Sequence, residues 1–268
     1  MALSLQDVQS AAQQLDDAER TRTQIPLLTN LHPDMDMGDA YAIQAEWVRR
    51  KRARGDAVTG WKIGLTSHAM QAALSINTPD SGVLFESMHF KNGAAIPRDR
   101  FIQPRIEAEI AFVIKSPLTG AKLSDEEILA ATAYIVPALE ILDTRIVRKD
   151  PSTGRLRTVF DTISDNAANA GVVIGTPIED FQNLDLRWLG AIVWRNDEVE
   201  ETGLGAGVLN SPARSVSWLV ERLSQYGDSV QSGQLVLSGS FIRPVEAPSG
   251  SAISADFGPL GRVECYFE

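Results

Sequence analysis

Residues 105–114 read RIEAEIAFVI, an apolar run of strand-forming residues with two carboxylates placed two residues apart. Because alternate side chains of a β-strand point to the same face, we expect Glu107 and Glu109 to project together while the apolar side chains fill the opposite face. Two neighbouring carboxylates repel each other and lose hydration when they are half buried. A divalent cation bound by oxygens would relieve both costs. The alternative is an edge strand whose acids face solvent.

A second stretch, residues 134–143 with the sequence YIVPALEILD, also reads as a buried strand that carries acids. Glu140 and Asp143 are an odd number of residues apart, so in a regular strand only one of them can share the face of Glu107 and Glu109. Glu140 has apolar neighbours on both sides and is the harder to explain as a surface residue. Asp143 lies at the strand end, where it could pair with Arg145.

The rest of the chain predicts more short strands than helices, and the two do not alternate regularly. This pattern favours an α+β fold with a β-rich core over a doubly wound parallel sheet. The first two predicted helices form an N-terminal helical segment, residues 1–57, which packs on a core of residues 58–268 to give one functional domain. Helices are predicted at 4–22, 39–54 and 211–226, and late strands at 186–195, 198–202, 252–257 and 262–267.

Composition narrows the class of protein. The chain has 268 residues, a formal net charge of −10, and 44% hydrophobic residues, as a globular protein of one large domain would. An acidic surface argues against nucleic acid and anionic membranes as partners. Cys265 is the single cysteine, so an intrachain disulfide is excluded and a reducing compartment is expected. The sequence shows no signal peptide and no long apolar run, so we expect a cytoplasmic protein.

The residue types around the buried acids indicate a site with oxygen ligands. His32, His68 and His89 lack the spacing of a zinc site, whereas Mg²⁺ or Mn²⁺ is suited to carboxylate ligands. The chain carries no G-x-G-x-x-G, no P-loop and no G-x-S-x-G elbow. Cys265 alternates within the last strand and is expected in the core rather than as a nucleophile.

Three further features have both a functional and an ordinary interpretation. Lys62 lies inside the apolar run GWKIGLT of residues 60–66, so it either extends to solvent or is held in place for a purpose. Asp80 lies in PDSG of residues 79–82, which is a turn by composition. The basic loop of residues 145–157 is either a solvated excursion or a lid that meets an anionic substrate.

Together these segments resemble the hydratase/decarboxylase family of aromatic meta-cleavage pathways, within the fumarylacetoacetate hydrolase superfamily. The resemblance covers nearly the whole chain. It is carried by the segments GWKIGLT (60–66), PDSG (79–82), RIEAE (105–109), PALE (137–140), SDNA (164–167) and GSF (239–241). Ser81 departs from the pattern, since relatives usually carry an aromatic residue there, and Ser211 stands where a histidine before proline is common.

The resemblance implies a mixed β-sandwich or roll core, a homo-oligomer (a pentamer or decamer), and Mg²⁺ held by Glu107, Glu109 and Glu140. It implies a small 2-oxo dicarboxylate substrate and a hydro-lyase that adds water to an unsaturated seven-carbon acid. Lys62 would steady a carboxylate or transfer a proton, and Asp80 would act as general base or acid. The implied substrate-binding residues are Leu65, Ser164, Ser240 and Arg148, with Lys149 a second choice for the distal carboxylate.

Other activities stay open at this point. A hydratase of the five-carbon monoacid and a decarboxylase of the 4-oxalocrotonate type would use the same carboxylates. An acylpyruvate hydrolase would need a water-activating base that the sequence does not reveal. A non-catalytic partner subunit would keep the carboxylates but could lack Lys62 and Asp80, so their presence favours an enzyme.

Overall fold

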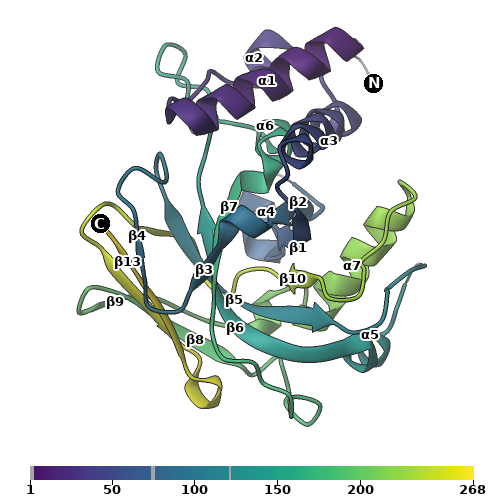
Figure 1. The fold of residues 1–268 in the computed structure, drawn as a ribbon, viewed down its shortest axis with the longest axis vertical. Helices are drawn as coiled ribbons and strands as arrows, with labels where there is room; N and C mark the ends of the chain where they lie inside the picture. The colour runs from purple at the N-terminus through teal and green to yellow at the C-terminus, as the bar shows by residue number, and fades with distance from the viewer. Residues whose placement is uncertain (1–2, 74–75, 121) are drawn as a thin grey trace.

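The computed structural model describes residues 3–73, 76–120 and 122–268 (Figure 1). Its helices are α1 (Leu5–Thr21), α2 (Leu28–Leu31), α3 (Met37–Ala53), α4 (His68–Ala73), α5 (Asp125–Ala131), α6 (Val159–Ser164) and α7 (Pro212–Ser224). Its strands are β1 (Val58–Gly64), β2 (Asp80–Phe85), β3 (His89–Lys91), β4 (Ala94–Ile96), β5 (Arg105–Ile114), β6 (Thr132–Leu142), β7 (Asn169–Ile174), β8 (Gly190–Arg195), β9 (Glu198–Leu204), β10 (Leu235–Leu237), β11 (Val245–Glu246), β12 (Ala252–Asp256) and β13 (Arg262–Phe267).

The described strands form two sheets. The larger has eight strands in the order β2-β1-β10-β5-β6-β7-β3, with β11 paired to β5, and the smaller has five in the order β4-β13-β12-β8-β9. The larger sheet curls through the middle of the molecule, and the smaller lies against one side of it (Figure 1). Both sheets mix parallel and antiparallel pairs, since β1 runs parallel to β10 while β5 and β6 are antiparallel.

The two longest strands, β5 and β6, pair along nearly their whole length. Ile106, Ile110 and Phe112 of β5 are fully buried on the face opposite the glutamates. Burying an apolar side chain of this size contributes about 1.5–3 kcal/mol, so this face anchors the strand in the core. The apolar face therefore keeps the strand in place even though burying the acids on its other face is unfavourable in free energy.

The N-terminal helices are fixed by caps and by contacts with the core. Ser4 and Asp7 form a capping box at the start of α1, and Thr158 and Asp161 form one at α6. Trp47 of α3 meets Phe85 of β2 edge to face at 5.8 Å between ring centroids. These helices gather at one end of the molecule (Figure 1).

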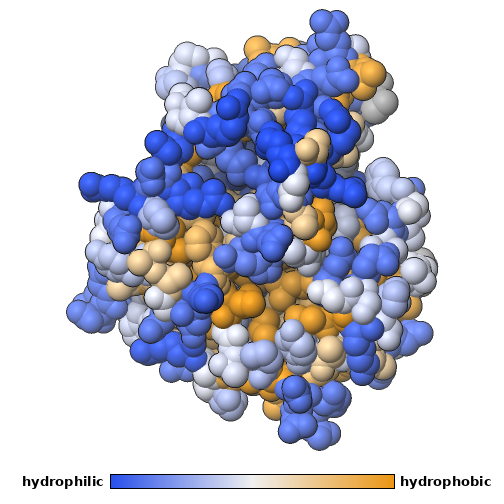
Figure 2. Space-filling model, in the orientation of Figure 1, coloured by the Kyte–Doolittle hydropathy of each residue, from blue (hydrophilic) through white to orange (hydrophobic). Residues whose placement is uncertain are grey.

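The α+β class, the β-rich core and the N-terminal helices predicted from the sequence are confirmed. The boundary at residue 57 stays a prediction. None of the described helices is long and apolar enough to cross a bilayer. The surface of the helical end is largely hydrophilic, whereas apolar patches are exposed over the sheets (Figure 2). Large apolar side chains exposed by more than two fifths include Trp188, Ile192 and Tyr266.

Candidate active site

Three glutamates meet on one face of the larger sheet. Glu107 of β5 stands directly opposite Glu140 of β6, and Glu109 follows two residues along β5. One carboxylate oxygen from each lies within 4.8 Å of the others. Glu109 and Glu140 are completely buried and Glu107 is half-buried. The period of two and the register of the β5–β6 pair therefore bring the three acids together.

Most oxygens of this group lack hydrogen-bond donors. The backbone N–H of Gly239 donates to Glu109 Oε2 at 2.8 Å. Glu109 Oε1 and both oxygens of Glu140 have no hydrogen-bond partner among the described residues. A buried acceptor without a donor costs roughly 1–3 kcal/mol, and more if it is charged, so a missing positive group is indicated here.

The sheet register also places Lys62 and Asp80 on this face. Lys62 pairs with Leu237 of β10, and Leu237 pairs with Ala111 of β5, two residues from Glu109. Asp80 pairs with Gly64, two residues from Lys62. Because side chains of paired residues point to the same face, the lysine and the aspartate join the glutamates. Lys62 Nζ lies 3.6 Å from Glu140 Oε1.

Two glycines make room for this arrangement. A Cβ on Gly64 would lie 2.2 Å from Asp80 Oδ1 and 2.8 Å from Lys62 Nζ, so a side chain there would displace both groups. Gly239 has φ 114, a conformation that disfavours any residue with a Cβ, and a Cβ there would lie 2.3 Å from Thr66 Oγ1. Gly239 can therefore aim its N–H at Glu109.

Burial and mutual repulsion shift the acids toward the protonated form. Burial raises the pKa of Glu107 to about 8, and the Glu140 carboxylate adds to the shift. Burial, followed by Glu140 and Glu107, raises the pKa of Glu109 well above its ordinary value. Burial also raises the pKa of Asp80, against the opposing effect of Lys62. Burial opposes the charge on Lys62, but the carboxylates, Glu140 first, hold its pKa above the ordinary range.

The donor set fits a hard divalent cation. Four buried carboxyl groups surround a single lysine, and three of them offer oxygens at the separation of ligands around one ion. Carboxylate oxygens without other partners are the ligands that Mg²⁺ and Mn²⁺ prefer. A divalent cation would reduce the excess negative charge and give the orphaned oxygens a partner.

The remaining predicted substrate-binding residues make local contacts. Leu65 has a positive φ of 56, and its carbonyl accepts a hydrogen bond from Gln71 Nε2 at 2.6 Å. The Ser164 hydroxyl donates to the Phe160 carbonyl at 2.8 Å. The structure brings Lys62 and Asp80 to the glutamates, whereas the substrate roles of Leu65 and Ser164 stay predictions.

Ser240 and Arg148 likewise stay predictions. The Ser240 hydroxyl donates to the Ile242 carbonyl at 2.8 Å. Arg148 Nη2 donates to the Gln103 carbonyl at 2.9 Å, and its Nη1 lies 3.8 Å from Glu246 Oε1. Arg148 therefore already has an acidic neighbour.

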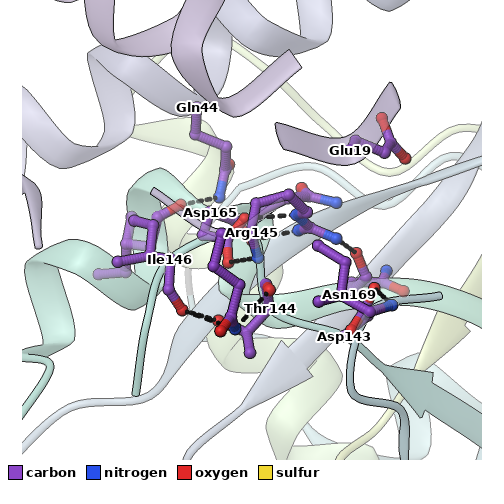
Figure 3. A network of polar contacts seen from close by, with 12 residues as sticks. Glu19, Gln44, Asp143, Thr144, Arg145, Ile146, Asp165 and Asn169 are labelled. Atoms are coloured by element: carbon purple, nitrogen blue, oxygen red, sulfur yellow. Dashed lines mark hydrogen bonds and ion pairs between the residues drawn. The ribbon is translucent and has the colours of Figure 1, made fainter. Parts of the chain in front are cut away.

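The suggested Asp143–Arg145 pair is wrong. Asp143 instead accepts hydrogen bonds from the backbone N–H groups of Ile102 and Gln103, each at 2.8 Å. Arg145 is fully buried and pairs with Asp165 (Figure 3). Its Nη2 donates to the Asp165 carbonyl at 2.6 Å. Asp165 lies at the end of α6, and its sequence neighbourhood carried no signal for a partner twenty residues away.

A cavity lies beside this site rather than in it. A space of about 640 Å³ opens between α3, β1, β2 and α7, and its lining includes Tyr41, Trp61, Ser81, Val83 and Tyr226. Trp61, Ser81 and Val83 alternate with Lys62, Asp80 and Gly82 along β1 and β2, so they face the opposite side of the sheet. The carboxylates and this cavity therefore belong to different faces.

Comparison with known proteins places this geometry among relatives. Residues 40–267 match the family model described as fumarylacetoacetate (FAA) hydrolase C-terminal. The chain is 50% identical over 257 residues, 96% of each chain, to the 2-oxo-hept-4-ene-1,7-dioate hydratase of Escherichia coli. It is 36% identical to a 4-oxalocrotonate decarboxylase of Pseudomonas sp. (strain CF600), over 99% of this chain and 98% of that one.

A solved structure is similar over the same length. The 4-oxalocrotonate decarboxylase from Pseudomonas putida G7, complexed with magnesium and adipate, matches with a TM-score of 0.93 and 32% identity over 99% of both chains. Its fold is therefore shared from the N-terminal helices to the last strand.

Proposed function

This chain belongs to the fumarylacetoacetate hydrolase family, and from that premise we propose that it is a metal-dependent hydro-lyase that adds water to 2-oxohept-4-ene-1,7-dioate. The observation that carries the proposal is the 50% identity, over 96% of both chains, to a hydratase of that substrate. The product would be 4-hydroxy-2-oxoheptanedioate. Lys62 and Asp80 beside the three glutamates support an enzyme over a non-catalytic partner subunit.

Glu107, Glu109 and Glu140 would hold the cation, for which we propose Mg²⁺, with Mn²⁺ as the alternative. When bound, the ion would supply a Lewis acid that polarises the 2-oxo group of the substrate. Lys62 is a buried cation 3.6 Å from Glu140, and it would bind and orient the substrate 1-carboxylate. The burial of these groups excludes water and strengthens each charge interaction.

Asp80 is the group we propose for proton transfer. Its burial favours the protonated form while Lys62 favours the ionised form, so the carboxyl can both take and return a proton. It would remove a proton from C3 and deliver one to C5, which moves the double bond into conjugation with the 2-oxo group. Water then supplies the hydroxyl group at C4 and a proton at C3, and no other reactant is needed.

The proposal also includes the substrate class, the oligomeric state and the cellular compartment of the enzyme. A relative of 32% identity is complexed with magnesium and adipate, a dicarboxylate, and this supports a small dicarboxylate substrate. The exposed apolar patches over the sheets support a homo-oligomer, a pentamer or decamer by the family resemblance. We place the enzyme in the cytoplasm, in aromatic meta-cleavage catabolism.

The test uses the dienol (enol) forms of two 2-oxo acids, the seven-carbon diacid and the five-carbon monoacid. Their ultraviolet absorbance is followed with Mg²⁺ and with EDTA. Products are identified by mass, and Glu109→Gln serves as the control without a complete ligand set. We expect loss of the diacid with gain of one water, abolished by EDTA and by the substitution.

Other outcomes would redirect the proposal. Loss of CO₂ would indicate a decarboxylase, and a preference for the monoacid would indicate a five-carbon hydratase. If neither compound is consumed in the presence of Mg²⁺ or Mn²⁺, the enzyme proposal is wrong.

A further inference from the structure

Arg157 is held in place on the loop between β6 and α6 by two contacts. Its backbone N–H donates to the Arg148 carbonyl at 3.0 Å. Its Nη1 donates to Thr144 Oγ1 at 2.6 Å. It immediately precedes Thr158, the N-cap of α6, so its backbone is fixed by the start of a helix. These contacts therefore hold the Arg157 guanidinium in a defined position.

Arg157 differs from the other arginines of its loop in being half-buried without an anionic partner among the described residues. Arg145 pairs with Asp165, and Arg148 lies near Glu246. Arg155 is exposed and donates to Asn30 Oδ1 at 3.1 Å. Among the residues that the structure describes, no carboxylate oxygen is recorded within 4.0 Å of Arg157. A half-buried guanidinium that donates only to a hydroxyl keeps donors in reserve for a ligand.

The nearby acids are already engaged. Asp165 accepts from Arg145, and Asp161 accepts from the Thr158 hydroxyl at 3.0 Å and from the Thr29 hydroxyl at 2.8 Å. Burial lowers the pKa of Arg157, and the Arg145 guanidinium adds to that effect, whereas the charges of Asp165, Asp161 and Asp80 oppose it. These acids act on Arg157 from a distance, and none of them is in hydrogen-bond or ion-pair contact with its guanidinium among the described residues.

The position of Arg157 relates it to the reacting groups. Thr144, its anchor, follows Glu140 by four residues, so their Cα atoms lie at most about 14 Å apart. Arg157 and Lys62 are the two cations whose charges act on Asp80. An extended seven-carbon chain spans roughly 8 Å between its end carbons, given C–C bonds of about 1.5 Å. A diacid whose first carboxylate lies at Lys62 and the glutamates can therefore extend past Asp80 toward Arg157.

We propose that Arg157 is the specificity-determining residue that binds the second carboxylate of a dicarboxylate substrate. The inference rests on the proposed function, because it extends a substrate whose first carboxylate is bound at Lys62. A guanidinium binds a carboxylate through two parallel N–H···O bonds, which Lys149 on the same loop could not do. This role was expected of Arg148, but Arg148 is occupied by Gln103 and Glu246.

The experiment compares Arg157→Gln with the matched control Arg155→Gln, because Arg155 is exposed on the same loop and its guanidinium donates to Asn30. Each is assayed with the seven-carbon diacid and the five-carbon monoacid, at saturating Mg²⁺. We expect Arg157→Gln to lower kcat/KM for the diacid on the order of 10²-fold, chiefly through a higher KM. The value of kcat/KM for the monoacid should change less than about threefold. Arg155→Gln should leave the ratio of kcat/KM for the two substrates unchanged. Arg157→Lys keeps the positive charge but not the two parallel N–H donors, so its kcat/KM for the diacid should lie between those of the wild type and Arg157→Gln.

A second readout does not depend on turnover. Calorimetric binding of adipate to the Mg²⁺-loaded protein should weaken in Arg157→Gln, while binding of hexanoate should not change. Equal losses for both substrates, or no loss for the diacid, would overturn the role of Arg157. A wild-type protein that hydrates neither dienol would instead contradict the proposed function, and the adipate measurement would still decide the carboxylate site.

Discussion

Two clusters of buried charged side chains differ in how their polar atoms are paired. The carboxylate cluster consists of Glu107, Glu109, Glu140, Lys62 and Asp80, and four of its carboxyl oxygens have no hydrogen-bond partner among the described residues. The arginine cluster is centred on Arg145 and Asp165 (Figure 3). Every guanidinium nitrogen of Arg145 has an acceptor there, in Asp165 or in the carbonyls of Asp165 and Asn169.

The difference separates a buried charge pair that satisfies itself from a group of like charges whose oxygens lack donors among the described residues. Arg145 and Asp165 neutralise each other and tie the loop after β6 to the end of α6. The carboxylate cluster keeps like charges together at a cost in stability, and the fold tolerates this because the apolar faces of β5 and β6 hold the strands in place. Burial alone therefore does not identify a site, whereas burial combined with unpaired acceptors does.

Glu109→Gln should produce the largest effect. Gln retains an acceptor for the Gly239 N–H but removes a charged ligand, so we expect hydration to fall by about 10⁴-fold or more. Calorimetry should show Mg²⁺ binding lost, and urea unfolding of the metal-free protein should show stability unchanged or increased. Retention of Mg²⁺-dependent activity would exclude the glutamates as the metal site.

Asp165→Asn should disrupt the arginine cluster. It leaves the buried Arg145 guanidinium without a compensating charge, and we expect a loss of about 3–5 kcal/mol in the free energy of unfolding. Urea unfolding in EDTA measures this loss, with Asp17→Asn, which removes an exposed partner of Arg20, as a control that should not shift the midpoint. An unchanged midpoint for Asp165→Asn would show that the arginine cluster does not stabilise the fold.

Asp80→Asn should separate catalysis from metal binding within the carboxylate cluster. We expect kcat to fall by about 10²–10⁴-fold because the substituted amide cannot transfer the proton. The dissociation constant for Mg²⁺ should change little, and the stability of the metal-free protein should not fall, since a buried acid has been removed. A variant that loses Mg²⁺ instead would make Asp80 a metal ligand rather than a proton carrier.

The pH dependence of the metal-free protein should give the smallest effect. Below the ordinary value of 4.5, Glu107 is protonated in both the folded and unfolded states, and between 4.5 and about 8 only the folded state keeps the proton. The free energy of unfolding should therefore decrease as pH rises from 6 to 8, by at most about 1.4 kcal/mol per pH unit for each retained proton. Chemical unfolding in EDTA measures this slope.

Saturating Mg²⁺ is the control for that titration. The cation competes with the protons, so its presence should remove or reverse the slope, and its affinity should rise with pH. A slope that is the same with and without Mg²⁺ would place the titrating groups outside the carboxylate cluster.

Local pattern in the sequence predicted much of the site. The spacing of Glu107 and Glu109 placed both on one face, and the apolar neighbours of Glu140 marked it as a buried acid. The helix predicted at 4–22 is α1, which begins at the capping box of Ser4 and Asp7. The family resemblance added roles for Lys62, which the sequence places in an apolar run, and for Asp80, which the sequence alone would have left as an ordinary turn residue.

Tertiary structure decided which of these residues meet. The register of β5 against β6 set Glu107 opposite Glu140, and a shift by one residue would have turned Glu140 away. The partner of Arg145 proved to be Asp165, twenty residues on, rather than the nearby Asp143. Only the tertiary structure showed that Arg157 has no acidic partner among the described residues. A sequence specifies local period directly, whereas contacts between distant residues depend on strand register and on loop paths that no local pattern encodes.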